Sequence, residues 1–582
     1  NQHGVGLYAE AMGTDAPTTG DGLLNKGMVD IPMGEFWTPR AGTEDGAAHN
    51  ADLKEAASAA HIYGKKIVAA ESFTTMPGAP VWASPYYMKQ VGDHALASGI
   101  NRIVFHTSDQ QPFVDGKRKP GMTLGPFGQH YTRNNTWADQ AIAWNTYISR
   151  CSELLQQGSF VGDLAYFYGE GAPVTVPSWK ATTPAPPDGY DYDWINADIM
   201  LHRVSVKEGR LVLPSGMSYA ALVLPDYVNQ MTLPMLRKIR DLVAEGAIVI
   251  APKPQGSPSL ADQDHAAEFQ SIANVVWGQI DGMGGTENNY GKGRVYWGRP
   301  VAEALAAAKT PPDFEYSRPE ADARLVWIHR RDGDVDIYFV ANQIRRAEDL
   351  TASFRFEGRE AELWHPDSGD ISPASYSSAD GRTTVPLHFD PLGSVFVVFR
   401  KKAVPSSRTL PHPEVKELAK FSGSWQVSFP PDLGAPPAIN LDKLISWTDS
   451  SEEGVKYFSG TATYSKDVQV SAAWLRSGAK LMLDLGDVEV IAQVSVNRKP
   501  LDEILWKPPY RIDVTRALKS GTNHIEIRVT NLWPNRVIGD QQPNAKQRYA
   551  WLDYRPYRAD TPLLESGLLG PVRILSVSTD RR

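Results

Sequence analysis

The first 155 residues alternate between short apolar segments and longer stretches with helical periodicity. The apolar segments are at residues 4–11, 28–36, 65–73 and 100–108. The helical patterns are at residues 47–64, 85–99 and 135–158. Short, almost wholly apolar strands that alternate with helices predict a parallel sheet covered by helices.

Polar side chains stand at the ends of these predicted strands. They are Glu10, Glu35, Glu71 and His106. Active sites of (β/α)8 barrels are built at the C-terminal ends of the strands, so this pattern favours a barrel. Only four units precede a change of pattern, whereas a closed barrel needs eight. We therefore expect residues 1–155 to form the C-terminal half of a catalytic barrel in a longer polypeptide. An open four-stranded sheet is the alternative.

The rest of the chain predicts a multidomain α/β plus β protein. Residues 156–300 read as a flavodoxin-like α/β domain, and residues 301–402 show the alternation and turn signals of a β-sandwich. A segment rich in Pro and Ser at 403–414 reads as a linker. Residues 415–582 are again mostly β and resemble a galactose-binding-like jelly roll.

Composition and charge narrow the classes of partner. The chain has 582 residues and a net charge of −8, which argues against nucleic acid or an anionic membrane as the main partner. We see no run of about 20 apolar residues that could span a bilayer. The first residues lack the basic start and apolar core of a signal peptide, as they would in a mature secreted protein. We expect a secreted or periplasmic location.

The single cysteine, Cys151, is predicted to be a packed structural thiol.

Carboxylates form the main candidate site, and they are Glu10, Asp15, Glu35 and Glu71. Hydrolysis of a glycosidic bond needs one carboxylic acid to protonate the leaving oxygen and a second carboxylate to activate water or attack the sugar. Aromatic neighbours raise the pKa of a carboxyl group, and Glu35 is followed by Phe36 and Trp37, which we expect to form a wall of the pocket. The alternative is that each Glu caps a helix or pairs with Arg or Lys.

Other polar residues could complete the site. His106 could contact a sugar hydroxyl or serve a structural role, and residues 128–137, with Arg133 and Trp137, could line a subsite or cap the next helix. Residues 529–540 favour an inter-domain packing loop over a sugar site. The histidines show no paired zinc spacing, whereas clustered carboxylates could hold calcium, which prefers oxygen ligands.

Several motifs together resemble glycoside hydrolase family 106, the α-L-rhamnosidases. They are "YAEAMG", "GMVDIPMGEFW", "KIVAAESFT", "NRIVFHTSDQQP" and "GQHYTRNNTW". The resemblance implies an inverting glycosidase that removes terminal α-L-rhamnosyl units, with calcium near the sugar. It places the base on Glu35 first and Glu71 second, and Glu10 at the sugar or the calcium. From the residues themselves, we also expect Trp37, His106, Arg133 and Trp137 to contact the sugar substrate. The general acid would lie upstream of this chain.

Two other functions stay open at this point. A β-galactosidase-like retaining glycosidase would also join a barrel to a flavodoxin-like domain. A non-catalytic carbohydrate-binding protein would keep a partial barrel and its β modules.

Overall fold

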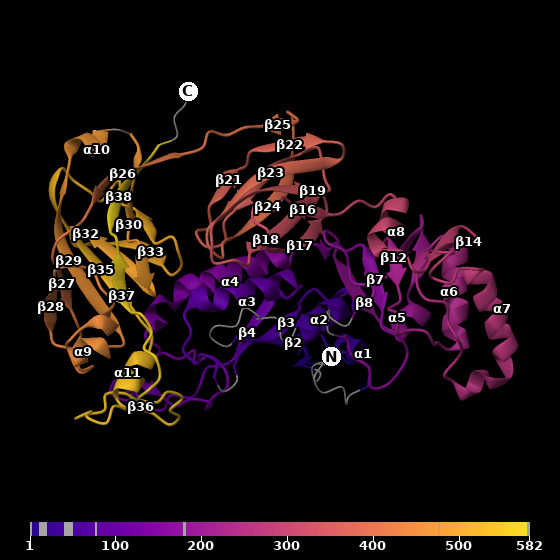
Figure 1. Cartoon of the computed structure of the whole chain (residues 1–582), viewed down its shortest axis with the longest axis horizontal. Helices are drawn as coiled ribbons and strands as arrows, with labels where there is room; N and C mark the ends of the chain where they lie inside the picture. Colours follow the sequence, from indigo (N-terminus) through magenta and orange to yellow (C-terminus); the bar gives the residue numbers. More distant parts are fainter. Residues whose placement is uncertain are drawn as a thin grey trace.

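The computed structural model describes residues 3–10, 20–39, 50–75, 78–177, 182–476 and 478–578. Figure 1 shows the α/β unit and the terminal β domain at opposite ends, with the N-terminal sheet and a β-sandwich between them. The predicted multidomain α/β plus β class is confirmed. Asp15 lies outside the described residues. No helix in the described segments is long and apolar enough to cross a membrane.

The N-terminal region contains a four-stranded parallel sheet in the order β1-β2-β3-β4. Its strands are β1 (Tyr8–Glu10), β2 (Ile31–Trp37), β3 (Ala69–Thr74) and β4 (Arg102–Phe105). Its helices are α1 (Gly22–Gly27), α2 (Asn50–Tyr63), α3 (Pro85–Ala97), η1 (Ala138–Gln140) and α4 (Ala141–Leu155), and β5 (Pro120–Gly121) lies in the loop after β4. The parallel sheet and three of the helices match the prediction, and α1 was not predicted. Cys151 is buried in α4.

Helix α2 is buried on almost every side, because it packs against β2 on one side and against the α/β unit on the other. Its alanines allow this close approach, since they project little beyond the helix backbone. Gly34 in β2, which has no side chain, also allows α2 to approach closely. A Cβ atom at this position would lie 2.9 Å from the Asp52 carbonyl oxygen.

The α/β unit is built on a six-stranded sheet in the order β14-β15-β13-β12-β7-β8. Its strands are β7 (Leu164–Phe167), β8 (Tyr192–Ile195), β12 (Ala221–Val223), β13 (Ile248–Ile250), β14 (Glu287–Tyr290) and β15 (Gly293–Tyr296). Its helices are α5 (Ala197–His202), α6 (Leu233–Glu245), η3 (Leu260–His265), α7 (Ala266–Trp277) and α8 (Val301–Ala307), and a small sheet joins β9 (Ser205–Lys207), β10 (Arg210–Val212) and β11 (Ser218–Tyr219). The parallel strands follow the 2-1-3-4-5 order of flavodoxin-like sheets.

The next region is two sheets packed face to face. The strands are β6 (Ser159–Phe160), β16 (Phe314–Tyr316), β17 (Leu325–Asp332), β18 (Val335–Asn342), β19 (Glu348–Phe354), β20 (Arg359–Trp364), β21 (Ile371–Pro373), β22 (Tyr376–Ala379), β23 (Arg382–Phe389), β24 (Ser394–Lys402) and β25 (Ser407–Arg408). Buried side chains such as Tyr338, Phe354 and Phe399 fill the space between the sheets. Part of the predicted linker at 403–414 is instead strand β25, since Ser407 and Arg408 pair with β22.

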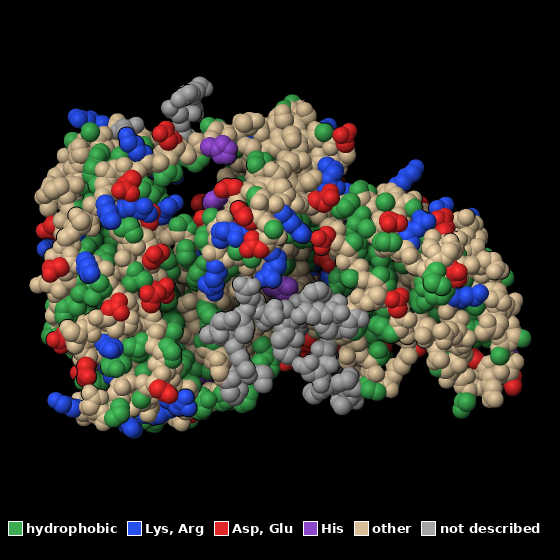
Figure 2. Space-filling view, in the orientation of Figure 1, with side chains coloured by type: hydrophobic (Ala, Val, Ile, Leu, Met, Phe, Trp, Pro, Cys, Tyr) green, Lys and Arg blue, Asp and Glu red, His purple; other side chains and the backbone are tan. Residues whose placement is uncertain are grey.

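The terminal domain has two larger antiparallel sheets, in the orders β26-β38-β30-β34 and β28-β27-β29-β35-β32-β33. Its elements are β26 (Glu414–Lys420), β27 (Trp425–Ser428), β28 (Ala438–Leu441), η4 (Trp447–Asp449), α9 (Glu453–Lys456), β29 (Thr461–Val470), α10 (Ala472–Arg476), β30 (Lys480–Asp484), β31 (Asp487–Glu489), β32 (Ile491–Val496), β33 (Lys499–Leu505), β34 (Arg511–Asp513), β35 (Gly521–Thr530), α11 (Pro534–Gly539), β36 (Trp551–Leu552), β37 (Gly567–Gly570) and β38 (Arg573–Ser578). Among the described residues on the face in Figure 2, basic and acidic side chains are interspersed.

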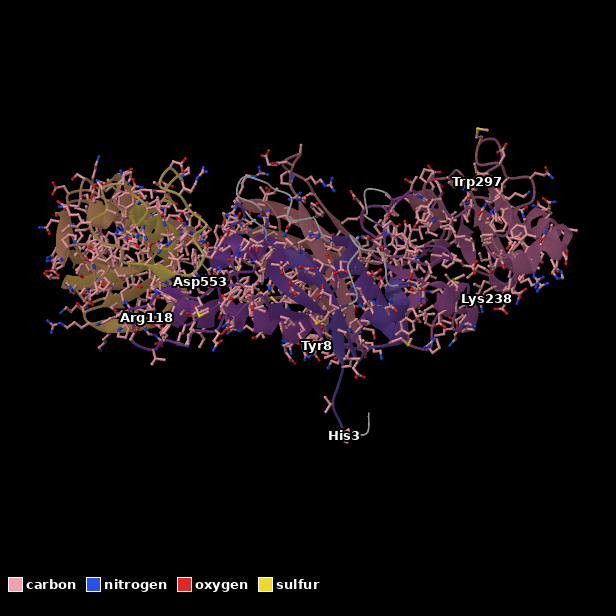
Figure 3. The ribbon with its side chains drawn as sticks, turned by 90° about the horizontal axis from the view of Figure 1, so that it is seen from below. His3, Tyr8, Arg118, Lys238, Trp297 and Asp553 are labelled. Atoms are coloured by element: carbon pink, nitrogen blue, oxygen red, sulfur yellow. The ribbon has the colours of Figure 1, made fainter. Side chains whose placement is uncertain are left out.

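The terminal domain is joined to the N-terminal region by hydrogen bonds, one of them buried. The Trp533 indole donates a hydrogen bond to the Asn134 carbonyl oxygen, at 2.9 Å. Figure 3 labels Asp553 at this junction, where its carboxylate accepts hydrogen bonds from the backbone and the hydroxyl of Thr123. The 529–540 segment therefore contributes to inter-domain packing, as its sequence favoured.

Candidate active site

Three glutamates lie on one face of the N-terminal sheet. Glu35 and Glu71 are direct partners in the parallel register of β2 and β3. Glu10 partners Met33, two residues before Glu35, so it projects from the same face. Because neighbouring strands are only about 4.8 Å apart, the three carboxyl groups share one small region at the C-terminal ends of the strands.

Burial and mutual repulsion raise the pKa values of two of these groups. The pKa of Glu10 is raised to about 8 by burial, then by the negative charges of Glu35, Asp52 and Glu71, while Lys26 opposes the shift. The pKa of Glu35 is raised to about 7 by burial and then by Glu71 and Asp52. A hydrogen bond with Glu71 adds to this rise, and one with Trp37 opposes it. At neutral pH the cluster therefore retains protons that isolated glutamates would lose.

Glu71 is held by side chains from the end of its own strand and from the segment after β4. The Thr74 hydroxyl donates a hydrogen bond to Glu71 Oε1 at 2.6 Å, and His106 Nδ1 lies 3.4 Å from the same oxygen. Thr74 Oγ1 also lies 3.0 Å from His106 Nδ1. The three side chains thus orient one another.

An irregularity in β3 places Thr74 for this contact. Phe73 has a φ of 67°, in the left-handed region that non-glycine residues rarely adopt. The register between β2 and β3 shifts there, so that Trp37 partners Thr74. Bulges of this kind re-aim side chains next to functional sites. The buried Phe73 ring contacts Phe36, with 4.9 Å between ring centroids, which anchors the irregular backbone in the core.

A buried ion-pair network between α1 and α2 supports the backbone of β2. Asp52 Oδ2 accepts a hydrogen bond from the Glu35 backbone N–H at 2.7 Å, and Asp52 Oδ1 pairs with Lys26 Nζ at 2.7 Å. Lys26 also donates to the Met33 carbonyl oxygen and lies 3.6 Å from Glu55. Sequence reasoning missed Lys26, because no helix was predicted around it, and Asp52, because it reads as an ordinary charged residue of a helix. No local signal marks either residue as part of a buried network.

The family model for α-L-rhamnosidases matches residues 1–378. The chain belongs to this family. The solved structure of a rhamnosidase from Novosphingobium sp. PP1Y is 40% identical, with a TM-score of 0.89, and the match covers 98% of this chain and 53% of that one. The resemblance found in the sequence is thereby confirmed.

Two other relatives are more distant. A putative beta-glucuronidase of Formosa agariphila is 28% identical over a match that covers 94% of this chain and 65% of that protein. A beta-galactosidase from Bacillus circulans is 11% identical, with a TM-score of 0.42 over 68% of this chain and 64% of that one, too low to support the galactosidase alternative. The chain spans about half of the rhamnosidase and about two thirds of the curated relative.

The two aromatic residues expected in the wall of the sugar pocket, Phe36 and Trp37, lie on opposite faces of the N-terminal sheet. Trp37 is half-buried and follows the alternation of Glu35, so it projects from the face that carries the glutamates. Phe36 is 1% exposed and lies in the core against Phe73, on the helix-covered side. The expectation that Phe36 forms part of the pocket wall is therefore wrong, because successive residues of a strand face opposite sides.

Of the remaining predicted substrate contacts, His106 lies at the glutamates, whereas Arg133 and Trp137 have other partners. His106 joins the glutamates through Glu71 and Thr74. Arg133 donates hydrogen bonds to the carbonyl oxygens of Gln111 and Phe113, the latter at 3.0 Å, so it braces the loop after β4. Trp137 is 2% exposed and packs edge-on against Tyr131 in the core. Neither side chain has a contact with the three glutamates.

The family resemblance also implied calcium. Within the described segments, no group of three or more acidic, histidine or cysteine side chains is arranged to hold a metal ion. Glu10 supplies carboxylate oxygens of the kind calcium prefers, but the described donors do not complete a site.

Proposed function

We propose that the complete polypeptide hydrolyses terminal α-L-rhamnosyl units of glycosides or polysaccharides, with inversion at the anomeric carbon. The observation that carries this proposal is the cluster of Glu10, Glu35 and Glu71 on one face of adjacent parallel strands, in a chain of the rhamnosidase family. Rigidly positioned carboxylates are the groups that glycoside hydrolysis needs.

The contacts favour Glu71 as the general base, which reverses the order that the sequence suggested. A general base must be held in position to take a proton from water, and the Thr74 hydroxyl donates a hydrogen bond that orients the Glu71 carboxylate. Glu35, with a pKa near 7, shares the region as a partly protonated neighbour. In this mechanism Glu71 removes a proton from water as the water oxygen attacks the anomeric carbon.

The general acid must then come from outside this pair. Carboxyl groups that act as acid and base in inverting enzymes stand about 6.5–9.5 Å apart, so that a water fits between them. Glu35 and Glu71 are register partners joined by a hydrogen bond, which is closer than this. We place the acid on a strand that completes the barrel beyond residues 1–582. The exposed apolar residues Leu7 and Tyr8 at the β1 edge of the sheet support a further strand there, and Figure 3 shows Tyr8 at the lower edge of the ribbon in that view.

The charge of the site favours a neutral sugar. The charge of Glu71 raises the pKa of both Glu10 and Glu35, and the charge of Glu35 raises that of Glu10, so a substrate carboxylate placed beside them would be repelled. A rhamnosyl unit has no carboxylate, whereas a glucuronosyl unit has one. The indole of Trp37 offers an apolar face for the methyl group of rhamnose. A secreted or periplasmic location is a further part of the proposal.

Hydrolysis of p-nitrophenyl α-L-rhamnopyranoside by the complete polypeptide tests the function. We expect Glu71→Gln to lower kcat by about a thousandfold and Glu35→Gln by about tenfold, since general-base catalysis contributes about 10²–10⁴-fold. Glu153→Gln, on the exposed side of α4, is the matched control and should leave kcat unchanged. Proton NMR should show the inverted anomer first. A retained anomer, or turnover of a glucuronide in preference to the rhamnoside, would refute the proposal.

A further inference from the structure

A cavity of about 670 Å³ lies where the N-terminal region meets the terminal β domain. One wall comes from residues 78–84 and Tyr87, in the loop after β3 and the first turn of α3. The opposite wall comes from residues 531–534 and 554–566 of the terminal domain, with Glu489 between. The volume is within the range of about 300–1,000 Å³ that small-molecule sites occupy.

The walls of this cavity are fixed before any ligand arrives. Trp82 and Trp533 are buried in a shared apolar cluster beneath it. The Trp82 ring lies 6.2 Å from the Tyr557 ring, centroid to centroid, which links the two domains directly. A preformed site binds at lower entropic cost than one that must be ordered by its ligand.

Aromatic and acidic groups together face the cavity. Tyr87, Tyr554 and Tyr557 supply flat rings with a hydroxyl edge. Glu489 and Glu565 supply two carboxylates, and neither accepts a hydrogen bond or forms an ion pair with another residue in the described parts of the chain. Both carboxylates line the same cavity, and burial and then the charges of Glu565 and Asp487 raise the pKa of Glu489 to about 7, while Arg345 opposes the shift.

The tyrosine rings and the two carboxylates indicate which class of ligand the cavity would bind. Carboxylates that lack protein donors are suited to accept hydrogen bonds from hydroxyl groups, and the tyrosine rings are suited to stack on the apolar face of a sugar ring. The same carboxylates repel an anionic ligand. A neutral carbohydrate satisfies all three conditions, whereas a uronic acid fails the last one.

The cavity is connected to the glutamate cluster through chain segments that the two sites share. The loop that forms its first wall begins just after Thr74, which holds Glu71. Thr75, the next residue, donates to the Pro126 carbonyl oxygen at 2.7 Å, and the Tyr87 hydroxyl donates to the Pro39 carbonyl oxygen, just beyond β2. Segments that carry the glutamates thus also build the cavity.

We propose that this inter-domain cavity is a binding site for a neutral saccharide portion of the glycan that carries the scissile unit. This inference rests on the proposed function, because it assigns the cavity to the leaving-group side of the same substrate. It assigns to the terminal β domain a direct part in recognising the substrate, and it favours neutral glycans over uronate-rich ones.

Direct binding tests the inference without relying on turnover. The complete polypeptide is titrated by calorimetry with neutral trisaccharides of glucose, galactose, mannose and xylose, and with a galacturonic acid trisaccharide. We expect at least one neutral trisaccharide to bind, and to bind about tenfold more weakly to Tyr554→Ala and to Glu565→Gln. Glu526→Gln, on β35 of the same domain, is the matched control and should bind as the unchanged protein does. Binding of none of the neutral sugars, tighter binding of the acidic one, or indifference to both cavity variants would overturn the inference.

Kinetics separate this inference from the proposed function. With a rhamnosylated neutral oligosaccharide, Glu565→Gln should raise KM about fivefold and leave kcat unchanged. With p-nitrophenyl α-L-rhamnopyranoside, which lacks the saccharide portion, KM should not change. Loss of turnover with intact trisaccharide binding would refute the proposed function alone. Turnover of the aryl rhamnoside without trisaccharide binding would refute the cavity assignment alone.

Discussion

At the residue scale, the register partners Glu35 and Glu71 differ because their surroundings differ. Glu71 receives a hydrogen bond from Thr74, whereas the Glu35 carboxyl is buried between other carboxylates. Sequence reasoning found both residues from their places at strand ends. It ranked Glu35 before Glu71, because the contact of Thr74 with Glu71 depends on the irregular backbone at Phe73, which no local pattern shows.

The raised pKa values of Glu10 and Glu35 make stability depend on pH. Both groups bind a proton more tightly in the folded state than in the unfolded state, where glutamate has a pKa near 4.5. Between about pH 4.5 and 8 the folded state therefore binds more protons, and its stability falls as the pH rises. We expect Glu10→Gln to raise the thermal midpoint at pH 8 by roughly 2 °C and to change it less at pH 5. Calorimetric scans at the two pH values check this, and an equal shift at both would contradict it.

At the element scale, α1 and α2 are joined to β2 by a single buried cation. Lys26 is 0% exposed, and it pairs with Asp52 and neighbours Glu55, both also buried. We expect Lys26→Met to destabilise the N-terminal region by about 3–5 kcal/mol, because it leaves two buried carboxylates without their cation. Denaturant unfolding followed by tryptophan fluorescence measures the loss. Lys65→Met, in the turn after α2, is the control. A loss equal to that of the control would show that the buried network contributes nothing.

The contact between α2 and β2 also limits what can stand at position 34. A Cβ atom there would lie 2.9 Å from the Asp52 carbonyl oxygen and 3.1 Å from Asp52 Oδ2. We expect Gly34→Ala to displace α2, at a cost of about 1–3 kcal/mol, and to lower kcat by weakening the Asp52 bond to the Glu35 backbone. Gly171→Ala, where a Cβ atom meets nothing within 4 Å, is the control. Unchanged kcat and stability in Gly34→Ala would contradict this account of the glycine.

At the scale of the whole molecule, the terminal β domain is held by a buried tryptophan. Trp533 is 3% exposed and donates to the Asn134 carbonyl oxygen across the junction. We expect Trp533→Ala to weaken the junction by about 3–5 kcal/mol and to release the domain to limited proteolysis before the rest unfolds. Leu260→Ala, an exposed apolar position in the α/β unit, should digest as the unchanged protein does. Equal protection of the terminal domain in both variants would show that Trp533 does not hold it.

The sequence by itself determined the order of α/β and β regions, the parallel strands that end in glutamates, and the rhamnosidase family. These follow from local periodicity and from short motifs, which act within a few residues along the chain. The tertiary structure alone decided that Lys26 and Asp52 support Glu35, that Phe36 and Trp137 are core residues, and that a cavity joins two domains. Each of these depends on contacts between segments far apart in the sequence, and such contacts are set by packing, which no local pattern records.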